Sequence, residues 1–428
     1  MKKRVVVLCL GLWCGLVGAQ AQLTLDDCRQ MAREHYPEIR QYDLIRQTES
    51  YNLSNAARAW IPQVALSAQA TWQTDVPTFP DVLTGMLARQ GVEIPGLQQD
   101  QYKVALELNQ TIWDGGKSSA DRGMARAEAA EQRSTADVEM YTLEGRIDEL
   151  YFGILLLDER IAQTRLTQDL LRSNLAKVEA LQRNGVAMQS DADVLEAELL
   201  TVGQQLGQFE ASRESYRSML GLFIGEALGD RTLLRPAVVE PPMGGNERPE
   251  LSLFAARIDR LAAQERLVKS ASMPRLGLFA QGYYGYPGLD FMQGMMNDNW
   301  SWNALLGVKL SWNFGAYYTQ KNNLDKLRNS RLQVEVQRDI FLFNTQLQST
   351  QENGNVARLR RALADDDRIV ALRRSVREAA ESKLRNGVID THDLLLKITD
   401  EANASMARSM REIELLKTLY ELKHTINR

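Results

Sequence analysis

The sequence carries one long pattern twice. Pro37 and Pro62 in the first half are matched by Pro249 and Pro274 in the second, and each pair of prolines is 25 residues apart. A period of about two hundred residues is far longer than the 20 to 50 residues of solenoid repeats, so we expect one structural unit in two copies. Two further matched motifs follow the prolines: Gly115-Gly116 with Gly315-Ala316, and Arg183-Asn184-Gly185-Val186 with Arg385-Asn386-Gly387-Val388.

The N-terminus has the features of a secretory signal peptide. Three cations precede an apolar stretch from Val5 to Val17, and Ala19-Gln20-Ala21 offers a small-residue cleavage site. The stretch is shorter than the roughly 20 residues that span a bilayer, which argues against a membrane anchor. Removal of residues 1–21 takes away three cations and no acid, so the net charge falls from -4 to -7. An acidic exported chain disfavours nucleic acid as a partner.

Cys28 is the one cysteine left after cleavage, so no intramolecular disulfide is possible. It follows Asp27 and not the small residue that lipidation needs, and we expect it to be packed on the first helix.

Two stretches without proline, residues 96–235 and 288–428, predict long helices. A helix from Ser118 to Arg183 would be roughly 100 Å long. The helix that returns, from about Asp193 to Leu222, is shorter. Helical segments at Leu25 to Ala59 and Pro249 to Ser272 are therefore expected to cover the remaining length. The first long helix carries a heptad seam typical of coiled-coil packing, formed by Ile147, Leu150, Ile154, Leu157, Ile161, Leu171, Leu175 and Val178.

Four segments alternate between apolar and polar residues and are predicted to be strands, at about 62–74, 102–113, 275–286 and 299–313. Each has about the length of a tilted membrane strand, and aromatic residues gather near the ends as they do at lipid interfaces. A half-buried soluble sheet shows the same alternation. The signal peptide and the aromatic placement favour the membrane. The candidate interface aromatics are Trp72, Trp113, Trp300, Trp302, Trp312 and Tyr284.

Strands in a bilayer must form a closed barrel, because an open edge leaves unpaired backbone groups in lipid. The smallest barrels have eight strands, so four strands per chain require several chains. The connecting segments 74–101 and 287–298 are expected to be irregular loops outside the cell.

The duplicated halves, the glycine pairs and the Asn-Gly-Val turns resemble the TolC-like outer-membrane efflux protein family over nearly all of residues 22–428. The resemblance implies a first efflux repeat at 22–225, a linker at 226–247 and a second repeat at 248–428. It implies a mostly α fold with a membrane β-barrel, in which a homotrimer pools its strands into twelve and continues them as an α-helical barrel. The expected place is the outer membrane of a Gram-negative bacterium, with a long periplasmic extension.

The same resemblance implies a passive exit channel of a tripartite efflux system for small molecules or drugs. Its expected partners are a periplasmic adaptor, also called a membrane fusion protein, and an inner-membrane transporter. A protein-secretion duct of the same fold and a soluble periplasmic coiled-coil scaffold are the alternatives. No enzyme is expected, and neither is a metal or cofactor, because His35, His392 and His424 are scattered and no phosphate-binding loop is present.

The helical turns are the candidate contacts for the adaptor: Asn184, Gly185, Val186, Asn386, Gly387 and Val388. A plain turn with a left-handed glycine gives the same motif without any partner. By the resemblance, Asp393 matches the first of two acids that restrict the tunnel mouth, while the second position is Leu396. Asp191 and Asp193 are the candidates in the first half. Helix capping is the alternative for these acids.

Overall fold

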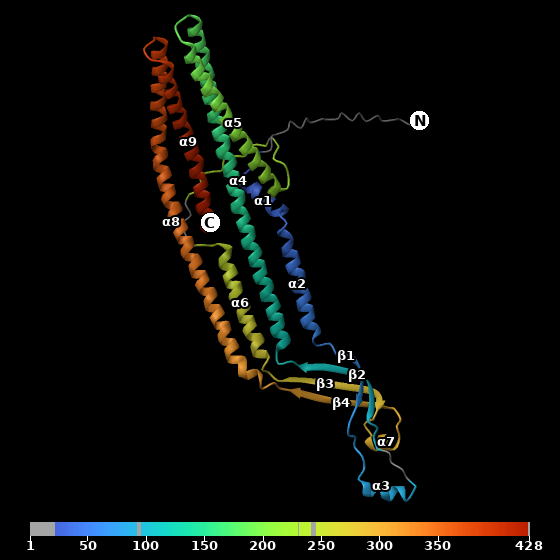
Figure 1. Cartoon of the computed structure of the whole chain (residues 1–428). Helices are drawn as coiled ribbons and strands as arrows, with labels where there is room; N and C mark the ends of the chain where they lie inside the picture. The colour runs from blue at the N-terminus through green and yellow to red at the C-terminus, as the bar shows by residue number, and fades with distance from the viewer. Residues whose placement is uncertain (1–21, 92–95, 230, 241–244, 427–428) are drawn as a thin grey trace, which may run out of the picture. The chain divides into compact units, whose positions relative to one another are not determined.

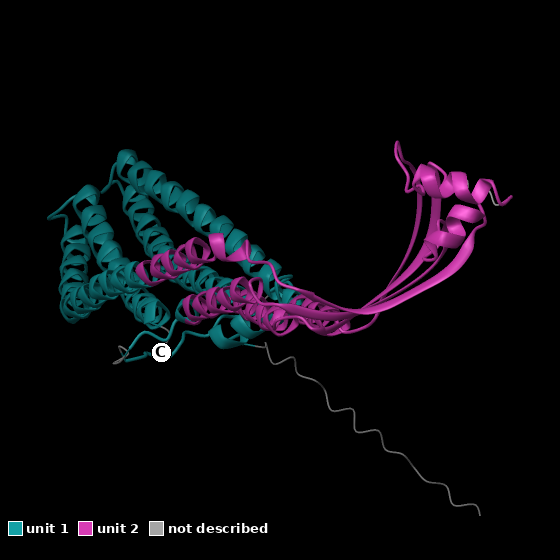
Figure 2. Ribbon diagram, turned by 90° about the horizontal axis from the view of Figure 1, so that it is seen from below, with its two compact units in different colours: residues 1–42, 135–251, 338–428 teal, residues 43–134, 252–337 magenta. Residues whose placement is uncertain are grey.

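The computed structural model describes residues 22–91, 96–229, 231–240 and 245–426. The predicted signal peptide lies outside these residues. The chain divides into two compact units, one of residues 1–42, 135–251 and 338–428 and the other of residues 43–134 and 252–337 (Figure 2). Each unit therefore draws on both halves of the repeat.

Helices dominate the chain, and one four-stranded sheet interrupts them (Figure 1). The first half contains α1 (Leu25–His35), α2 (Ile39–Arg58), β1 (Gln63–Trp72), α3 (Asp81–Ala88), β2 (Asp100–Trp113), α4 (Lys117–Arg183) and α5 (Gln189–Ile224). The second contains α6 (Pro249–Ser270), β3 (Arg275–Tyr286), α7 (Phe291–Met296), β4 (Ser301–Ser311), α8 (Ala316–Arg385) and α9 (Thr391–Ile426).

The duplication is evident in the element order and in the helix lengths. In both halves a helical segment, a strand, a short helix, a second strand, a long helix and a shorter helix follow one another. The long helices α4 and α8 have 67 and 70 residues, and α5 and α9 have 36 each. The predicted mostly α fold with four strands per chain is confirmed.

The sheet has the order β1-β2-β3-β4, and all neighbouring strands are antiparallel. The four predicted strands lie where the alternation indicated, and each predicted end is within two residues of the observed one. Within the described residues the outer edges of β1 and β4 have no strand partner.

Three parts of the chain differ from expectation. The N-terminal helical segment is broken between α1 and α2, where Tyr36 is extended at φ -62° and ψ 131°. Pro37 explains the break, because proline lacks an N–H and disfavours helical backbone in the residue before it. The two connecting loops are not wholly irregular, since α3 and α7 form in them. Pro80 directly precedes α3, and the Asp290 carboxylate caps α7 by accepting from the Gln293 N–H at 3.0 Å.

The heptad seam of α4 contributes to both hydrophobic clusters of the first unit. Seven of its eight residues are buried, and Leu175 is half-buried. Tyr151 is fully buried beside the seam, and its single hydroxyl proton is shared between the carbonyl oxygens of Leu23 at 2.9 Å and Leu234 at 2.5 Å. Cys28 is also fully buried on α1, as expected, and burial raises the pKa of its thiol to about 12.

A second hydrophobic cluster joins the ends of four helices, α4, α5, α8 and α9. Its members are Leu171, Val178, Ala192, Leu195, Val202, Ala380, Leu394 and Ile398. No helix in the described ranges has an apolar stretch long enough to cross a bilayer.

Candidate functional site

The register of the sheet gathers the four alternating patterns into one apolar face. Leu106 pairs with Leu66 on one side and Gly282 on the other, and Leu276 pairs with Leu310. Side chains opposite each other across a ladder lie on the same face. The large apolar side chains of this face are exposed, and they include Val64, Leu66, Val104, Leu106, Leu108, Leu278, Leu306, Val308 and Leu310.

The opposite face is polar and internally hydrogen-bonded. The Lys103 ammonium donates to Gln281 Oε1 at 3.0 Å, and Gln281 Nε2 donates to Glu107 Oε1 at 2.7 Å. Lys103 also lies 4.5 Å above the ring of Tyr283. A sheet with an exposed apolar face and a charged face is suited to lipid on one side and water on the other.

Aromatic side chains collect at both ends of the sheet. At one end the ring centroids of Tyr284 and Trp302 are 5.0 Å apart, and Trp300 stacks on Tyr102 at 5.9 Å. Trp72 ends β1 opposite Asp100 at the same end, and Trp113 and Trp312 lie at the other. From Trp302 to Trp312 a strand at about 3.3 Å per residue covers roughly 33 Å. A tilt of about 40° reduces this to roughly 25 Å, the height of the apolar band of a membrane barrel.

The two helical turns have the same backbone geometry. Gly185 and Gly387 have φ of 74° and 70°, in the left-handed region that glycine adopts without strain. The N–H of Val186 donates to Leu181 O, and the N–H of Val388 to Lys383 O, both at 2.9 Å. Each turn is therefore a Schellman motif that ends a long helix. The plain structural role of both glycines is confirmed.

Apolar side chains are exposed at both turns. Val186 is 71% exposed, Val388 68% and the neighbouring Met188 74%. A Schellman motif usually places the residue after its glycine in contact with the helix. These valines instead face solvent, so the turns carry more exposed apolar surface than turn formation requires.

The acids near the turns have different roles. Asp191 caps α5, because its carboxylate accepts from the Met188 N–H at 2.8 Å. Asp193 accepts from the Gln189 amide at 2.7 Å. In the second half Asp390 accepts from the Asp393 N–H at 2.8 Å, so Asp390 and not Asp393 caps α9. Among the described residues the Asp393 carboxylate accepts no hydrogen bond, and its side chain is exposed.

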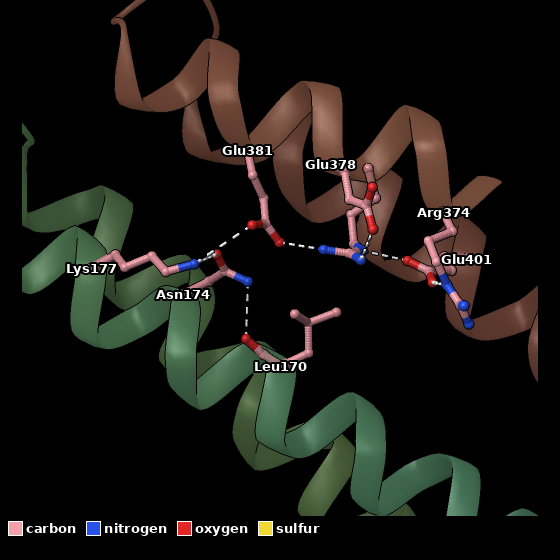
Figure 3. A network of polar contacts seen from close by, with 8 residues as sticks. Leu170, Asn174, Lys177, Arg374, Glu378, Glu381 and Glu401 are labelled. Atoms are coloured by element: carbon pink, nitrogen blue, oxygen red, sulfur yellow. Dashed lines mark hydrogen bonds and ion pairs between the residues drawn. The ribbon is translucent and has the colours of Figure 1, made fainter. Parts of the chain in front are cut away.

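A polar network connects α8 to α9 and to α4 close to these turns (Figure 3). Arg377 is the centre of the network and forms ion pairs with Glu401 and, at 2.5 Å, with Glu381. Lys177 of α4 lies 3.6 Å from the other oxygen of Glu381. The side chains of Arg377 and Glu401 are only 13% and 12% exposed. Arg374 adds a second cation 3.1 Å from Glu401.

The sequence alone did not indicate this network. Arg374, Arg377 and Glu381 have the ordinary spacing of charges on a solvated helix face, and Lys177 and Glu401 come from two other helices, so no motif marks the five. No group of His, Cys, Asp or Glu side chains in the described part of the chain is placed to hold a metal ion.

The two-faced sheet and the long paired helices together define a chain of the outer-membrane channel class. The family model described as "Outer membrane efflux protein" matches residues 28–226. No curated protein matches the sequence significantly. Solved structures match over 94% of the chain: the outer-membrane channel OprN (15% identity, 89% of that chain, TM-score 0.70), VceC from Vibrio cholerae (14%, 95%, 0.71) and CmeC from Campylobacter jejuni (12%, 85%, 0.68).

Residues 28–226 match the outer membrane efflux protein family, and the whole chain shares the fold of solved TolC-like outer-membrane channels. The family match and the shared channel fold support an outer-membrane efflux channel and no enzyme. They also place the chain in the outer membrane of a Gram-negative bacterium, with long helices in the periplasm.

Proposed function

We propose that the chain is the passive exit channel of a tripartite efflux system and acts as a homotrimer. In this assembly three sheets close into one twelve-stranded barrel, and the helices of the repeats at 22–225 and 248–428 form a tunnel wall. Small molecules or drugs pass from an inner-membrane transporter through a periplasmic adaptor into this duct.

The register of the sheet is the observation that carries the proposal. Its apolar face is exposed in the single chain, and the edges of β1 and β4 are unpaired among the described residues. Unpaired strand edges cost several kcal/mol per group in lipid, so the edge of β4 is expected to pair with β1 of the next chain. The polar face of the sheet then lines a water-filled bore.

The sheet also separates the proposal from its alternatives. A soluble periplasmic scaffold is not expected to expose a continuous apolar face between two groups of aromatic side chains, because soluble proteins rarely expose large apolar patches. A protein-secretion duct shares the barrel and differs in the cargo. Deletion of the gene separates these cargoes, because loss of a small-molecule duct raises drug susceptibility while loss of a secretion duct removes proteins from the medium.

The assembly is tested on the full exported chain extracted from outer membranes in detergent. Light scattering is expected to give the mass of three chains. The unboiled sample is expected to migrate as a trimer on gels and, in planar bilayers, to form steady channels. A monomer that stays dissolved without detergent contradicts the proposal.

The turns at 184–186 and 386–388 are proposed to contact the adaptor. Exposed Val186 and Val388 make this testable with Val186→Cys and Val388→Cys, because the native Cys28 is buried and does not react. A thiol-linked photo-cross-linker at either turn is expected to capture the adaptor. Leu166→Cys on α4, 63% exposed in the wild type, is the matched control. Equal capture from all three positions rules out a specific contact.

A further inference from the structure

A hollow of about 650 Å³ lies where α4 begins and α6 ends, within the unit that contains the sheet. Four cations line it, Arg122 and Arg126 from α4 and Arg266 and Lys269 from α6. The lining residues described there include no carboxylate. This concentration of positive charge has no part in the channel function described above.

The hollow lies on a different side of α4 from the residues that meet the polar face of the sheet. Lys117, Ser118 and Asp121 line a different hollow, together with the polar-face residues Asn109, Thr111, Arg275, Lys309 and Ser311. At about 100° per residue, the centre of Arg122 and Arg126 is roughly 115° around α4 from the centre of that set. Gly115 and Gly116, which follow β2, and Met273, which precedes β3, also line the hollow, so the cations lie directly beyond the end of the sheet that carries Trp113 and Trp312.

Three of the four cations lack a counter-charge. Lys269 forms an ion pair with Glu265 at 2.5 Å, and Asp121 of α4 forms one with Lys117 at 2.7 Å. Among the described residues, none of Arg122, Arg126 and Arg266 forms an ion pair. The Nε–H of Arg122 donates a hydrogen bond to the Ser118 carbonyl oxygen at 3.3 Å.

The guanidinium of Arg266 lies against α4 at Gly123. A Cβ on Gly123 would lie 3.7 Å from the Nη2 of Arg266. Arg266 therefore lies over α4 at Gly123, a position between Arg122 and Arg126 along the helix. Three guanidinium groups so close together repel one another unless an anion is shared among them.

We propose that this hollow binds the phosphate of an anionic phospholipid headgroup in the periplasmic leaflet. Guanidinium groups match phosphate oxygens in geometry and charge. Cations just outside the apolar band of a membrane protein attract anionic lipids. The proposal rests on the membrane placement of the sheet, and neither trimer formation nor the export partners enter it.

Native mass spectrometry of the detergent-purified full exported chain tests the proposal, with palmitoyl-oleoyl phosphatidylglycerol as the probe. The wild type is expected to retain phosphatidylglycerol and to retain phosphatidylcholine much less. The triple variant Arg122→Gln/Arg126→Gln/Arg266→Gln is expected to reduce retention by about tenfold or more. The matched control removes three exposed cations from α8, Arg328→Gln/Arg361→Gln/Arg368→Gln, and is expected to retain lipid like the wild type.

Three results overturn the proposal: equal retention by the triple variant and the wild type, an equal loss in the control variant, or equal retention of phosphatidylcholine. Soluble glycerol phosphate distinguishes the sources of phosphate. If it displaces the lipid at equal concentration, the site takes a free anion and the lipid assignment is wrong. Should the triple variant fail to fold, Arg126→Gln/Arg266→Gln, which changes only exposed side chains, gives the same test.

Discussion

Trp113 of β2 lies opposite Leu276 of β3, because the ladder between these strands skips Ile112. Up to Thr111, which lies opposite Gly277, the odd-numbered residues of β2 are on the polar face. The extra residue of a β-bulge shifts this alternation by one position. Trp113 therefore joins the apolar face at the end of the strand, where an interface aromatic is expected.

The apolar face predicts an asymmetric response to charge. Leu106→Arg places a cation at the middle of the lipid-facing surface, where it costs about 2 to 4 kcal/mol. Asn109→Arg places the same charge on the polar face and is expected to be tolerated. The amount of unboiled trimer in outer membranes measures both. Equal yields of the two variants would show that the faces are assigned wrongly.

The exposed carboxylate of Asp393 predicts that cations bind at the periplasmic mouth of the proposed tunnel and change its conductance. Like charges repeated by symmetry at a narrow point bind multivalent cations. Asp393→Ala is therefore expected to raise single-channel conductance or to weaken block by multivalent cations in planar bilayers. Asp169→Ala, on the exposed surface of α4, is the control and is expected to leave both unchanged. If Asp393→Ala and the wild type give the same currents, Asp393 does not line the mouth.

The ion pair of Arg377 and Glu401 predicts strong coupling near the turns. Removal of Arg377 leaves Glu401 with the exposed Arg374 and Glu381 with the exposed Lys177 as their counter-charges. Arg377→Met is therefore expected to destabilise the helical part by about 2 kcal/mol, less than a buried charge left with no partner. Arg377→Met/Glu401→Met is expected to recover a large share of this loss. Arg172→Met breaks the exposed pair with Asp169 and is expected to change stability by less than about 1 kcal/mol. Urea unfolding of Arg377→Met, Glu401→Met and the double variant measures the coupling, and additive losses would contradict it.

His424 predicts a loss of stability in acid. It stacks on Tyr141 at 4.1 Å in a hollow of about 530 Å³. Burial, and then the charges of Arg248 and Arg29, lower the pKa of its imidazole to about 4. The folded pKa is below the unfolded value of about 6.5, so stability is complete above pH 6.5 and is lost as the pH falls toward 4.

The expected loss from His424 is about 2 kcal/mol between pH 7 and pH 5. His424→Gln does not titrate and is expected to lack this component. Burial raises the pKa of the Glu352 carboxyl in the same hollow, which acts in the opposite direction. The difference between variant and wild type in urea unfolding isolates His424. The same pH dependence in both proteins would rule out its role.

Much of the fold could be predicted from the sequence, because heptads, alternation and turn glycines are patterns among residues close together in the chain. The heptad of α4 predicted the buried seam from Ile147 to Val178, and glycine predicted the turns at Gly185 and Gly387. Helical segments inside the outer loops were missed, since α3 and α7 are short and follow no long apolar period. Of the candidate acids, only the cap at Asp191 has a visible bond to the backbone, and the mouth at Asp393 stays a prediction.

The sequence by itself determined the duplication, the long helices and the alternation of the four strands, because periodicity along a chain reports which side chains share a face. Only the tertiary structure decided which segments, far apart in the chain, pack against those faces. The bulge at Ile112, the pairing of Arg377 with Glu401 across two helices and the convergence of Arg122 with Arg266 depend on contacts between segments far apart in the chain. Such contacts leave no spacing in the sequence, since they arise only when the ladder and the helices are packed.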